Sequence, residues 1–175
     1  MGGRRFAGTA TGLDRVSLLS VDGELARWLS PDQRRAAGPE LWAPSGRLEP
    51  GPWEPPTEPP GGADLGLLVI DGALTREVIV DRARGVELLG RGDLIRPWQE
   101  DSASFCAVTW RILEPTRLAI LDQRVTATLG RWPPLMTALV ERALRRSRWL
   151  VVQTALSHLV GVAKSVLTVL WHLAE

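Results

Sequence analysis

Hydrophobic residues in the middle of the chain fall into short runs separated by turn residues, roughly every eight to twelve positions. Residues 65–70 form a continuous apolar run of strand length, and the turn pair Asp71-Gly72 follows it. Residues 74–80 alternate in the manner of a strand, and further strands are predicted over 86–89, 94–96, 105–113 and 117–121. Many short strands with regular turns predict a small β-barrel or β-sandwich.

The segment before these strands is rich in proline. Residues 38–62 contain eight of the thirteen prolines and five glycines, a density that excludes a helix and any long central strand. One interpretation is a disordered linker, and the other is a series of short edge strands and tight turns. Short pieces at 41–43, 47–49 and 52–54 favour the second, because the first and the last contain Trp42 and Trp53 and disordered segments are usually poor in tryptophan.

Short helices are predicted on both sides of this β-rich region. Asp22 is a good N-cap for a helix that ends near residue 29 and carries Leu25, Trp28 and Leu29 on one face. Ser30 before Pro31 predicts a second short helix, which ends before Gly38. Asp122 is the expected cap of another short helix after the last strand.

A long helix is predicted over residues 134–159, because Trp132 is followed by two prolines at positions that tolerate them. It spans roughly 39 Å at 1.5 Å per residue, which is too long to lie wholly on a small β domain. A helix that projects must bury its apolar face on something, so we predict a homodimer. The predicted contact face repeats at spacings of three, four and seven: Met136, Leu139, Val140, Ala143, Leu150 and Thr154.

The remainder of this region also has a helical pattern. The arginines at 142, 145, 146 and 148 lie mostly between the apolar positions, and we expect them to be solvated or paired with acidic residues. Gly161 marks a break, and residues 162–174 predict a second, more apolar helix.

The length of 175 residues indicates one domain with an appendage. Residues 1–13 are rich in Gly, Arg and Thr without periodicity and are expected to be disordered. Residues 14–128 are predicted to form the N-terminal helices and the β domain. Residues 129–175 are predicted to form the long helix and the helix after it.

Charge and cysteine content narrow the class of protein. A net charge of +1, from 21 basic and 20 acidic residues, excludes a strongly basic nucleic-acid coat and an acidic disordered tail. The single cysteine, Cys106, excludes an internal disulfide and a Cys-rich zinc site, and it fits a reducing cytoplasm. We expect Cys106 to be a small core residue. We expect no signal peptide, because no apolar run follows the basic residues at the N-terminus, and we expect the uncharged stretch 149–163 to be too short to span a membrane.

Motifs for catalysis are absent from the sequence. Both histidines, His158 and His172, lie near the C-terminus, so none is available to ligate a metal among the strands. His158 on a helix face is expected to be structural. The sequence contains no nucleophile elbow, P-loop or paired-glycine dinucleotide motif. We therefore expect no metal, no cofactor and no enzymatic activity.

Two strings in the β region carry a family resemblance: residues 67–72, Leu-Leu-Val-Ile-Asp-Gly, and residues 87–98, Glu-Leu-Leu-Gly-Arg-Gly-Asp-Leu-Ile-Arg-Pro-Trp. Together they resemble the cyclic-nucleotide-binding-like β-roll of Crp/Fnr-type bacterial transcription regulators, and more narrowly an actinobacterial branch with the second string. Residues 117–122 and 141–148 are similar to the last strand and the long dimer helix of that branch. The resemblance covers residues 15–175.

The resemblance implies an α+β, mainly β fold: a double-stranded β-helix or jelly roll with short N-terminal helices and a long C-terminal dimerisation helix. It also implies that a winged helix-turn-helix follows and binds operator DNA. This chain stops about one helix after the dimerisation helix, so we expect the DNA-binding domain to be missing from it. We then expect contact with operator DNA only through that absent domain.

The effector site that the resemblance implies is altered here. Members that bind cyclic nucleotides carry a Gly-Glu pair, whose glutamate accepts the ribose hydroxyl, and an Arg-Ser or Arg-Thr pair, whose arginine neutralises the cyclic phosphate. Arg96-Pro97 and Cys106-Ala107 occupy those places, so cyclic AMP is not expected as an effector. Arg96, Trp98 and Gln99 are the candidates to bind another anion. The alternative is a turn fixed by Pro97, with Trp98 in the core.

Two function classes follow from the sequence. The first is the effector-sensing and dimerisation region of a Crp/Fnr-like transcription regulator in the cytoplasm. The second is a stand-alone module that uses the β-roll and the long helix to bind a partner protein. The sequence names no effector, operator or pathway.

Overall fold

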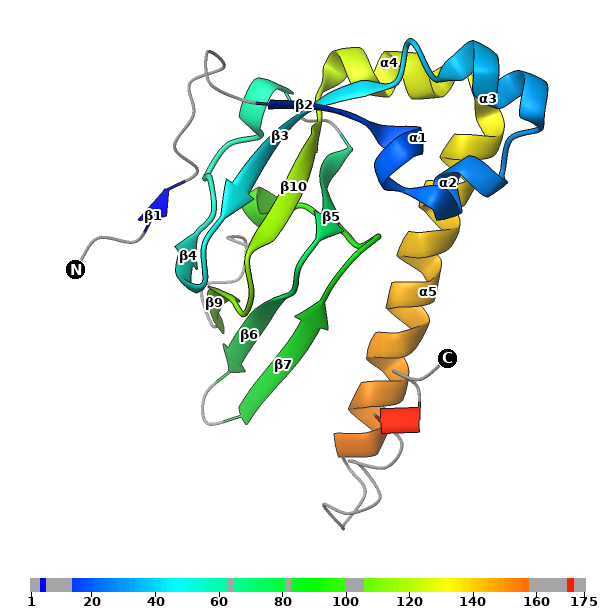
Figure 1. Cartoon of the computed structure of the whole chain (residues 1–175). Coiled ribbons are helices and arrows are strands. Elements are labelled where there is room, and N and C mark those ends of the chain that lie inside the picture. Colours follow the sequence, from blue (N-terminus) through cyan, green and yellow to red (C-terminus); the bar gives the residue numbers. More distant parts are fainter. Residues whose placement is uncertain are drawn as a thin grey trace.

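Two five-stranded sheets form the body of the protein (Figure 1). The computed structural model describes residues 4–5, 14–62, 65–80, 83–99, 106–157 and 170–171. One sheet, here called the outer sheet, has the strand order β1-β4-β9-β6-β7, and the other, the middle sheet, has the order β2-β3-β10-β5-β8. Neighbouring strands are antiparallel except β1 and β4. The strands are β1 Arg4–Arg5, β2 Asp14–Ser17, β3 Trp42–Leu48, β4 Gly51–Glu54, β5 Gly66–Asp71, β6 Leu74–Val80, β7 Ala83–Leu89, β8 Leu94–Ile95, β9 Cys106–Ile112 and β10 Thr116–Leu121.

Helices cover the face of the middle sheet that points away from the outer sheet. They are α1 Leu18–Val21, α2 Gly23–Arg27, α3 Pro31–Ala37, α4 Gln123–Gly130 and α5 Pro133–Ser157, with 3-10 turns at η1 Pro60–Gly62 and η2 Pro97–Gln99. The α5 helix runs down one side of the molecule, past α2 and beyond the middle sheet (Figure 1). The predicted long helix over 134–159 therefore exists, and it begins at the predicted prolines.

The middle sheet is buried on both faces, which explains its continuous apolar runs. In β5, Leu67 and Val69 join the core between the sheets, whereas Leu68 and Ile70 join the core beneath the helices. Alternation along a strand sends successive side chains to opposite faces. β10 repeats the pattern, with Leu118 and Ile120 on one side and Ala119 and Leu121 on the other. The predicted sandwich-like β domain is confirmed, with a helical third layer.

The proline-rich segment contains a central strand, where the sequence predicted only edge strands. β3 lies between β2 and β10 although it includes Pro44. Pro44 pairs with Arg15 of β2, whereas the ladder with β10 begins at Ser45 and runs to Leu48. The proline's missing N–H thus interrupts no bond to β10. The preference for strands and turns over a linker is confirmed, and the exclusion of a long central strand is wrong.

Side-chain caps start the short helices as predicted. The carboxylate of Asp22 accepts a hydrogen bond from the backbone N–H of Leu25 at 3.0 Å, at the start of α2. Ser30 and Gln33 form a reciprocal capping box at α3. Asp122 accepts from the backbone N–H of Val125 at 2.8 Å and begins α4. Trp28 was predicted to share one helix face with Leu25 and Leu29, but it is exposed whereas the two leucines are buried.

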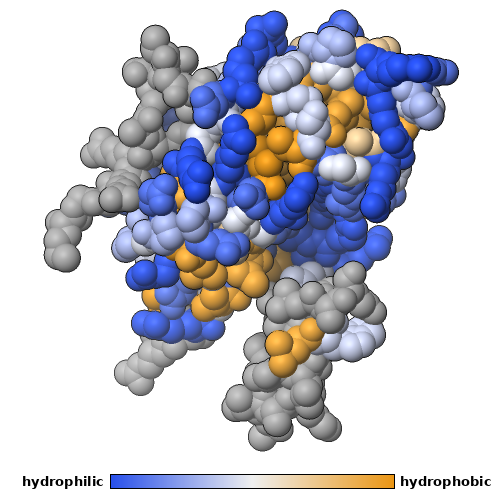
Figure 2. Space-filling model, in the orientation of Figure 1, coloured by the Kyte–Doolittle hydropathy of each residue, from blue (hydrophilic) through white to orange (hydrophobic). Residues whose placement is uncertain are grey.

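β7 forms one edge of the outer sheet among the described strands. It begins at Ala83 rather than at residue 86, because its ladder with β6 continues to the pair Val80 and Ala83. Figure 2 shows apolar surface over β6 and β7, where Val80, Val86 and Leu88 are exposed. The roll therefore presents one apolar sheet edge near α5.

Several predictions lie outside the described residues. They concern the break at Gly161, the helix over 162–174 apart from residues 170–171, both histidines, and most of residues 1–13. Arg4 and Arg5 are described, and they pair with Trp53 and Glu54. In the described part of the chain, none of the helices is long and apolar enough to cross a membrane.

Candidate functional site

A cavity of about 380 Å³, here called the tryptophan cavity, borders the core between the two sheets. Trp53 of β4, Trp98 of η2 and Trp110 of β9 line it. Four prolines, two threonines and Val108 add mainly apolar wall, and among the described residues Glu54 is the one ionisable group in the lining. A concave, mainly apolar site with few polar groups is the usual form of a small-molecule site.

Two of these tryptophans are held rigidly by the outer sheet. Trp53 and Trp110 are register partners on β4 and β9. Their ring centroids lie 5.6 Å apart at an interplanar angle of 78°, an edge-to-face arrangement. Trp53 is only 4% exposed, and its indole Nε1 has no hydrogen-bond partner among the described residues. Buried indole N–H groups usually find a partner, and this one lies in the core between the sheets, where its nitrogen is inaccessible to solvent.

The three residues predicted to bind a ligand, Arg96, Trp98 and Gln99, do not line one common cavity. Trp98 is half-buried, lines the tryptophan cavity and packs against the core between the sheets. Arg96 and Gln99 are exposed and do not line this cavity. Pro97 is buried between them and begins η2. The turn fixed by proline therefore forms, and it brings Trp98 rather than Arg96 to the cavity.

Arg146 joins α5 to β7 and β8 of the roll. Its guanidinium donates to both carboxylate oxygens of Glu87, at 2.7 and 2.9 Å, and to the carbonyl of Leu94 at 2.8 Å. Glu87 also accepts from Arg76 at 3.2 Å. Leu94 starts β8, and the chain reaches Pro97 of the cavity wall three residues later. The long helix thus holds the strand that leads into the cavity.

A second, buried ion pair joins α5 to the N-terminal helices. Arg142 donates to both carboxylate oxygens of Asp22, at 2.5 and 2.8 Å, and to Glu24 at 2.9 Å. The Arg142 and Asp22 side chains are 6% and 8% exposed. Arg145 adds a more exposed bond to Glu24 at 2.8 Å. Three of the four arginines for which solvation or pairing was predicted are thus paired with acidic residues.

These contacts shift the pKa values of both carboxylates on the N-terminal side. Burial alone raises the pKa of Asp22, but the hydrogen bonds from Arg142 and Leu25 and the charge of Arg142 outweigh it and hold the pKa below its ordinary value. The hydrogen bond from Arg145 lowers the pKa of Glu24. Both groups are therefore ionised at neutral pH, and the arginines keep their counter-charges.

Asp93 is shifted in the opposite direction. Burial raises its pKa, although its carboxylate accepts a hydrogen bond from the backbone N–H of Gly90 at 2.8 Å. It ends a tight turn in which Gly92 has a φ of 92°, a conformation that favours glycine. This turn lies against Arg142, because a side chain added at Gly92 would meet that guanidinium at 3.7 Å.

Asp93→Asn is expected to raise the melting temperature at pH 7. The folded pKa lies above the unfolded value of 3.8, so this group's contribution to stability is complete below that value and is lost as the pH rises through the folded pKa. Asparagine keeps an acceptor for Gly90 without the buried charge. Thermal unfolding at pH 7 and pH 4 measures the effect, and the gain should shrink at pH 4. A loss of stability that is equal at both pH values would contradict this assignment.

The predicted dimer residues fall on two different faces of α5. Leu139 is buried in the core beneath the helices, and Met136 packs partly against that core. Val140 and Ala143 are exposed, Leu150 is half-buried, and the side chain of Thr154 lies outside the described side chains. Leu139 is thus not accessible to a partner subunit, because its own protomer covers it. The positions opposite this buried face are all exposed: Thr137, Val140, Leu144, Ser147 and Val151, here called the α5 strip.

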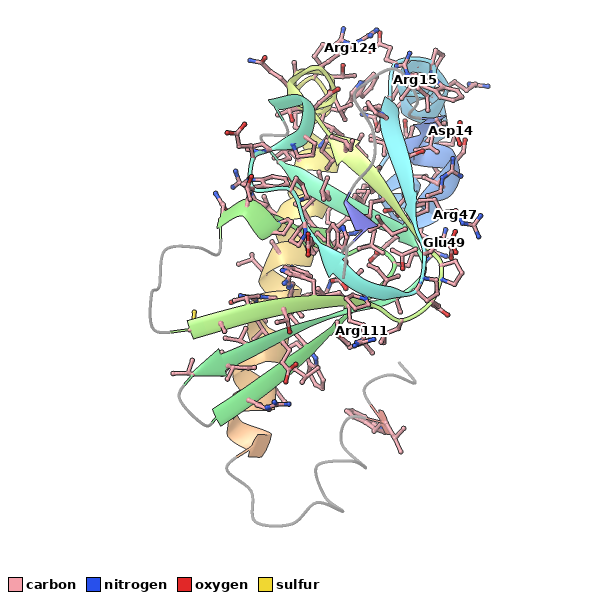
Figure 3. All side chains as sticks on the ribbon, turned by 90° about the vertical axis from the view of Figure 1, so that its left-hand side faces the viewer. Asp14, Arg15, Arg47, Glu49, Arg111 and Arg124 are labelled. Atoms are coloured by element: carbon pink, nitrogen blue, oxygen red, sulfur yellow. The ribbon has the colours of Figure 1, made fainter. Side chains whose placement is uncertain are left out.

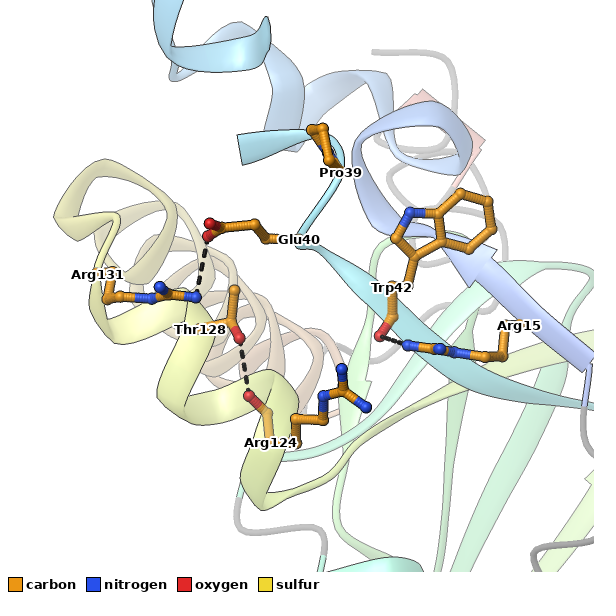
Figure 4. A pocket seen from close by; sticks show the side chains of 7 residues that line it. All are labelled: Arg15, Pro39, Glu40, Trp42, Arg124, Thr128 and Arg131. Carbon is orange, nitrogen blue, oxygen red and sulfur yellow. Dashed lines mark hydrogen bonds and ion pairs between the residues drawn. The ribbon is translucent and has the colours of Figure 1, made fainter. Parts of the chain in front are cut away.

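A second hollow, of about 490 Å³, lies between the α3–β3 turn, β2 and α4. Arg15 and Arg124 lie at the same end of the molecule (Figure 3) and line it together with Arg131 and Trp42. Figure 4 shows Arg131 bonded to Glu40, at 2.9 Å, and Arg15 donating to the carbonyl of Trp42, at 3.4 Å. Its charged side chains are exposed and its lining is mainly polar, whereas the lining of the tryptophan cavity is mainly apolar.

The described part of the chain contains no group of three or more His, Cys, Asp or Glu residues that could hold a metal ion. Cys106, predicted to lie in the core, is half-buried at the start of β9.

Comparisons with known proteins show the fold. No family model and no curated protein sequence matches this chain. The structure of a CooA mutant from Carboxydothermus hydrogenoformans is similar, with 13% identity, a TM-score of 0.51, and coverage of 86% of this chain and 95% of that chain. The chain therefore has the cyclic-nucleotide-binding-like β-roll and C-terminal helix of Crp/Fnr-type proteins, as the resemblance implied.

Two further structures are similar at a TM-score of 0.47. The catabolite activator protein of Thermus thermophilus is 20% identical, with 75% of this chain and 62% of that chain covered. Oxidized CprK in complex with o-chlorophenolacetic acid is 14% identical, with 65% of this chain covered. This chain spans about half the length of that CprK chain, 47%.

Sequence reasoning missed two parts of the site. Trp53 and Trp110 were taken as strand residues only, although each occupies an inward position of an alternating strand. The pair of Arg142 with Asp22 joins residues 120 positions apart, and no local pattern indicates such a contact.

Proposed function

We propose that this chain is the effector-sensing and dimerisation region of a transcription regulator, and that a small molecule binds in the tryptophan cavity. The observation that carries the proposal is the placement of this cavity at the η2 turn, beside the strand that Arg146 of α5 holds. A ligand against Trp98 would press on η2 and β8. Because the Leu94 carbonyl of β8 bonds to Arg146, a shift there changes the position of α5.

A homodimer through the α5 strip completes the proposal. The strip follows spacings of three, four, three and four, which is the heptad pattern that favours pairing with a like helix. It lies opposite the face that packs on the roll, so both contacts can form at once. A two-fold axis along the helices would bring the same strip of each subunit together. Effector binding at the roll would then alter the relation of the two subunits.

The lining of the cavity supports an effector other than a cyclic nucleotide. Among the described residues in the lining there is no Arg, Lys or His to neutralise a cyclic phosphate. Charge-assisted hydrogen bonds contribute about 1.5 to 3 kcal/mol each. A cyclic phosphate placed here would lose its water without gaining such a bond.

Trp98→Ala is expected to weaken effector binding by at least about tenfold, because it removes one aromatic wall. A fragment library, screened by thermal shift on the intact chain, identifies a ligand. At a hundred times its Kd, a ligand stabilises the folded state by about 2.7 kcal/mol. Cyclic AMP should give no shift. Trp28→Ala, at an exposed tryptophan outside the cavity, is the control and should leave the affinity unchanged.

Two outcomes would contradict the proposed function. One is a library screen in which none of the fragments stabilises the protein. The other is a ligand whose affinity does not change in Trp98→Ala, because its site would then lie elsewhere.

A further inference from the structure

We infer that the second hollow, here called the arginine hollow because Arg15, Arg124 and Arg131 line it, binds a small molecule that carries a dianionic phosphate group. This site is separate from the tryptophan cavity, because the two linings share no described residue. Three features carry the inference: the excess of positive charge in the lining, the convergence of two arginines without acidic partners, and the size of the hollow.

The lining of the arginine hollow has an excess of two positive charges. Arg15 comes from β2, Arg124 from α4 and Arg131 from the residue that ends α4, whereas Glu40 is the one acidic group among the described lining residues. Glu40 bonds to Arg131 at 2.9 Å, so these two charges largely cancel. The uncompensated charge therefore belongs to Arg15 and Arg124.

Arg15 and Arg124 have no acidic partner among the described residues. Arg15 donates to the carbonyl of Trp42 at a long 3.4 Å, and the guanidinium of Arg124 makes no hydrogen bond or ion pair within the described part of the chain. In Figure 4 the two guanidinium groups extend toward one another, from β2 and from α4. Like charges that converge in this way repel each other, and an anion between them removes the repulsion and accepts hydrogen bonds from both.

A phosphate monoester fits this arrangement better than other organic anions do. It carries about −1.5 to −2 charges at pH 7 and has three strong acceptor oxygens, so two guanidinium groups can each bond to it. A carboxylate has one charge and two oxygens, which match a single arginine. A cyclic phosphate diester also has only one charge, so cyclic AMP belongs with the weaker ligands.

The size of the arginine hollow favours a small molecule. Its volume of about 490 Å³ lies within the usual range for small-molecule sites. Trp42, which is 41% exposed, and Pro39 are the apolar residues of the lining, so the organic part of the ligand has apolar neighbours. An extended nucleic-acid strand instead needs a positively charged groove that follows its backbone. A free phosphate monoester therefore fits this hollow better than nucleic acid does.

Phenyl phosphate and phenyl sulfate test the charge requirement, because they share one ring and a tetrahedral group but differ in charge. Calorimetry on the intact chain, in about 0.15 M salt, measures both affinities. At this salt concentration the screening length is about 8 Å, so charges close to the ligand dominate. We expect phenyl phosphate to bind at least about tenfold more tightly, since its second charge strengthens the hydrogen bonds from the second arginine.

Arg124→Gln removes one of the two converging charges. It should weaken the binding of phenyl phosphate by about tenfold and leave the melting temperature unchanged. Arg111→Gln is the matched control, because Arg111 is also exposed and has no acidic partner among the described residues, but it does not line the hollow. Arg111 lies away from Arg15 and Arg124 (Figure 3), and its substitution should leave the affinity unchanged.

Glu40→Gln should have the opposite effect. It removes the negative charge from the lining and releases Arg131, so phenyl phosphate should bind about three- to fivefold more tightly. Because Glu40 and Arg131 are both exposed, this variant should fold normally. It tests the site even if Arg124→Gln is unstable, and an unchanged or lower affinity would contradict the inference.

Four other results would overturn the inference. The first is equal affinity for phenyl phosphate and phenyl sulfate, and the second is an equal loss in Arg124→Gln and Arg111→Gln. The third is binding of phenyl phosphate that is lost in Trp98→Ala but not in Arg124→Gln, because the ligand would then lie in the tryptophan cavity. The fourth is binding of a duplex DNA oligonucleotide that depends on Arg124, without binding of phenyl phosphate, which would assign this surface to nucleic acid.

Discussion

Arg142→Met is expected to lower the free energy of unfolding by about 3 to 5 kcal/mol. Methionine replaces most of the apolar stem of Arg142. It leaves the carboxylate of Asp22, which is 8% exposed, without the guanidinium that donates a hydrogen bond to each of its two oxygens. A buried charge without a counter-charge is strongly unfavourable. Urea unfolding monitored by circular dichroism measures the loss, and the slope with urea should stay unchanged.

A matched control is available on the same helix. Arg145→Met removes an arginine whose side chain is 60% exposed and which also bonds to Glu24, so its loss should be at most about 1 kcal/mol. Adding Asp22→Asn to Arg142→Met removes the stranded charge and keeps an acceptor for the cap at Leu25. The double variant should recover part of the stability. Equal losses for Arg142→Met and Arg145→Met would show that the buried pair is not what secures α5.

Val151→Glu is expected to weaken the homodimer by about a hundredfold or more. The α5 strip places Val151 at a heptad position, and a carboxylate desolvated there without a partner is unfavourable by about 3 kcal/mol or more. Val152→Glu is the control, because this neighbouring valine is also exposed but lies outside the strip. Light scattering across a concentration series measures the dimer fraction of each variant.

A monomer at tens of micromolar for the unaltered chain would contradict the homodimer. The strip would then remain an exposed helix face beside a β-roll, which is the form expected of a module that binds a different protein. Equal dissociation of Val151→Glu and Val152→Glu would contradict the position of the interface and leave the dimer itself in place.

Under the proposed function, the two faces of α5 have different roles. One face carries Leu139, Arg142 and Arg146 to the roll, and the other carries the strip. Arg146 reaches the carbonyl of Leu94, three residues before the turn that holds Trp98. An effector bound as proposed would therefore act on the proposed subunit interface through β8 and α5.

Much of the fold was predictable because its signals are local. The capping residues Asp22, Ser30 and Asp122 start their helices through bonds to backbone groups within three positions. The apolar run at 65–70 predicted a strand, and its lack of alternation follows from burial on both faces. The position of β3 was predicted wrongly because of Pro44. A proline interrupts a strand pairing only where its missing N–H would have bonded to the neighbouring strand, and the sequence does not show which neighbour that is.

The candidate site was predictable only in part. Trp98 was placed correctly in a turn fixed by Pro97, and the structure brings it to a cavity. The other walls, Trp53 and Trp110, come from strands more than fifty positions apart that pair in register. The sequence also did not show which face of α5 is exposed. Leu139 and Val140 are both apolar and both fit a helical repeat, yet only Leu139 is buried.

The sequence by itself determined most strands between residues 65 and 121, the helix caps and the long helix, because each depends on residues close together in the chain. Only the tertiary structure decided the tryptophan cavity, the pairing of Arg142 with Asp22, and the division of α5 into a buried face and an exposed strip. Those features depend on which distant surfaces meet. Hydrophobic burial is non-directional, so an apolar pattern states that a face is covered without stating what covers it.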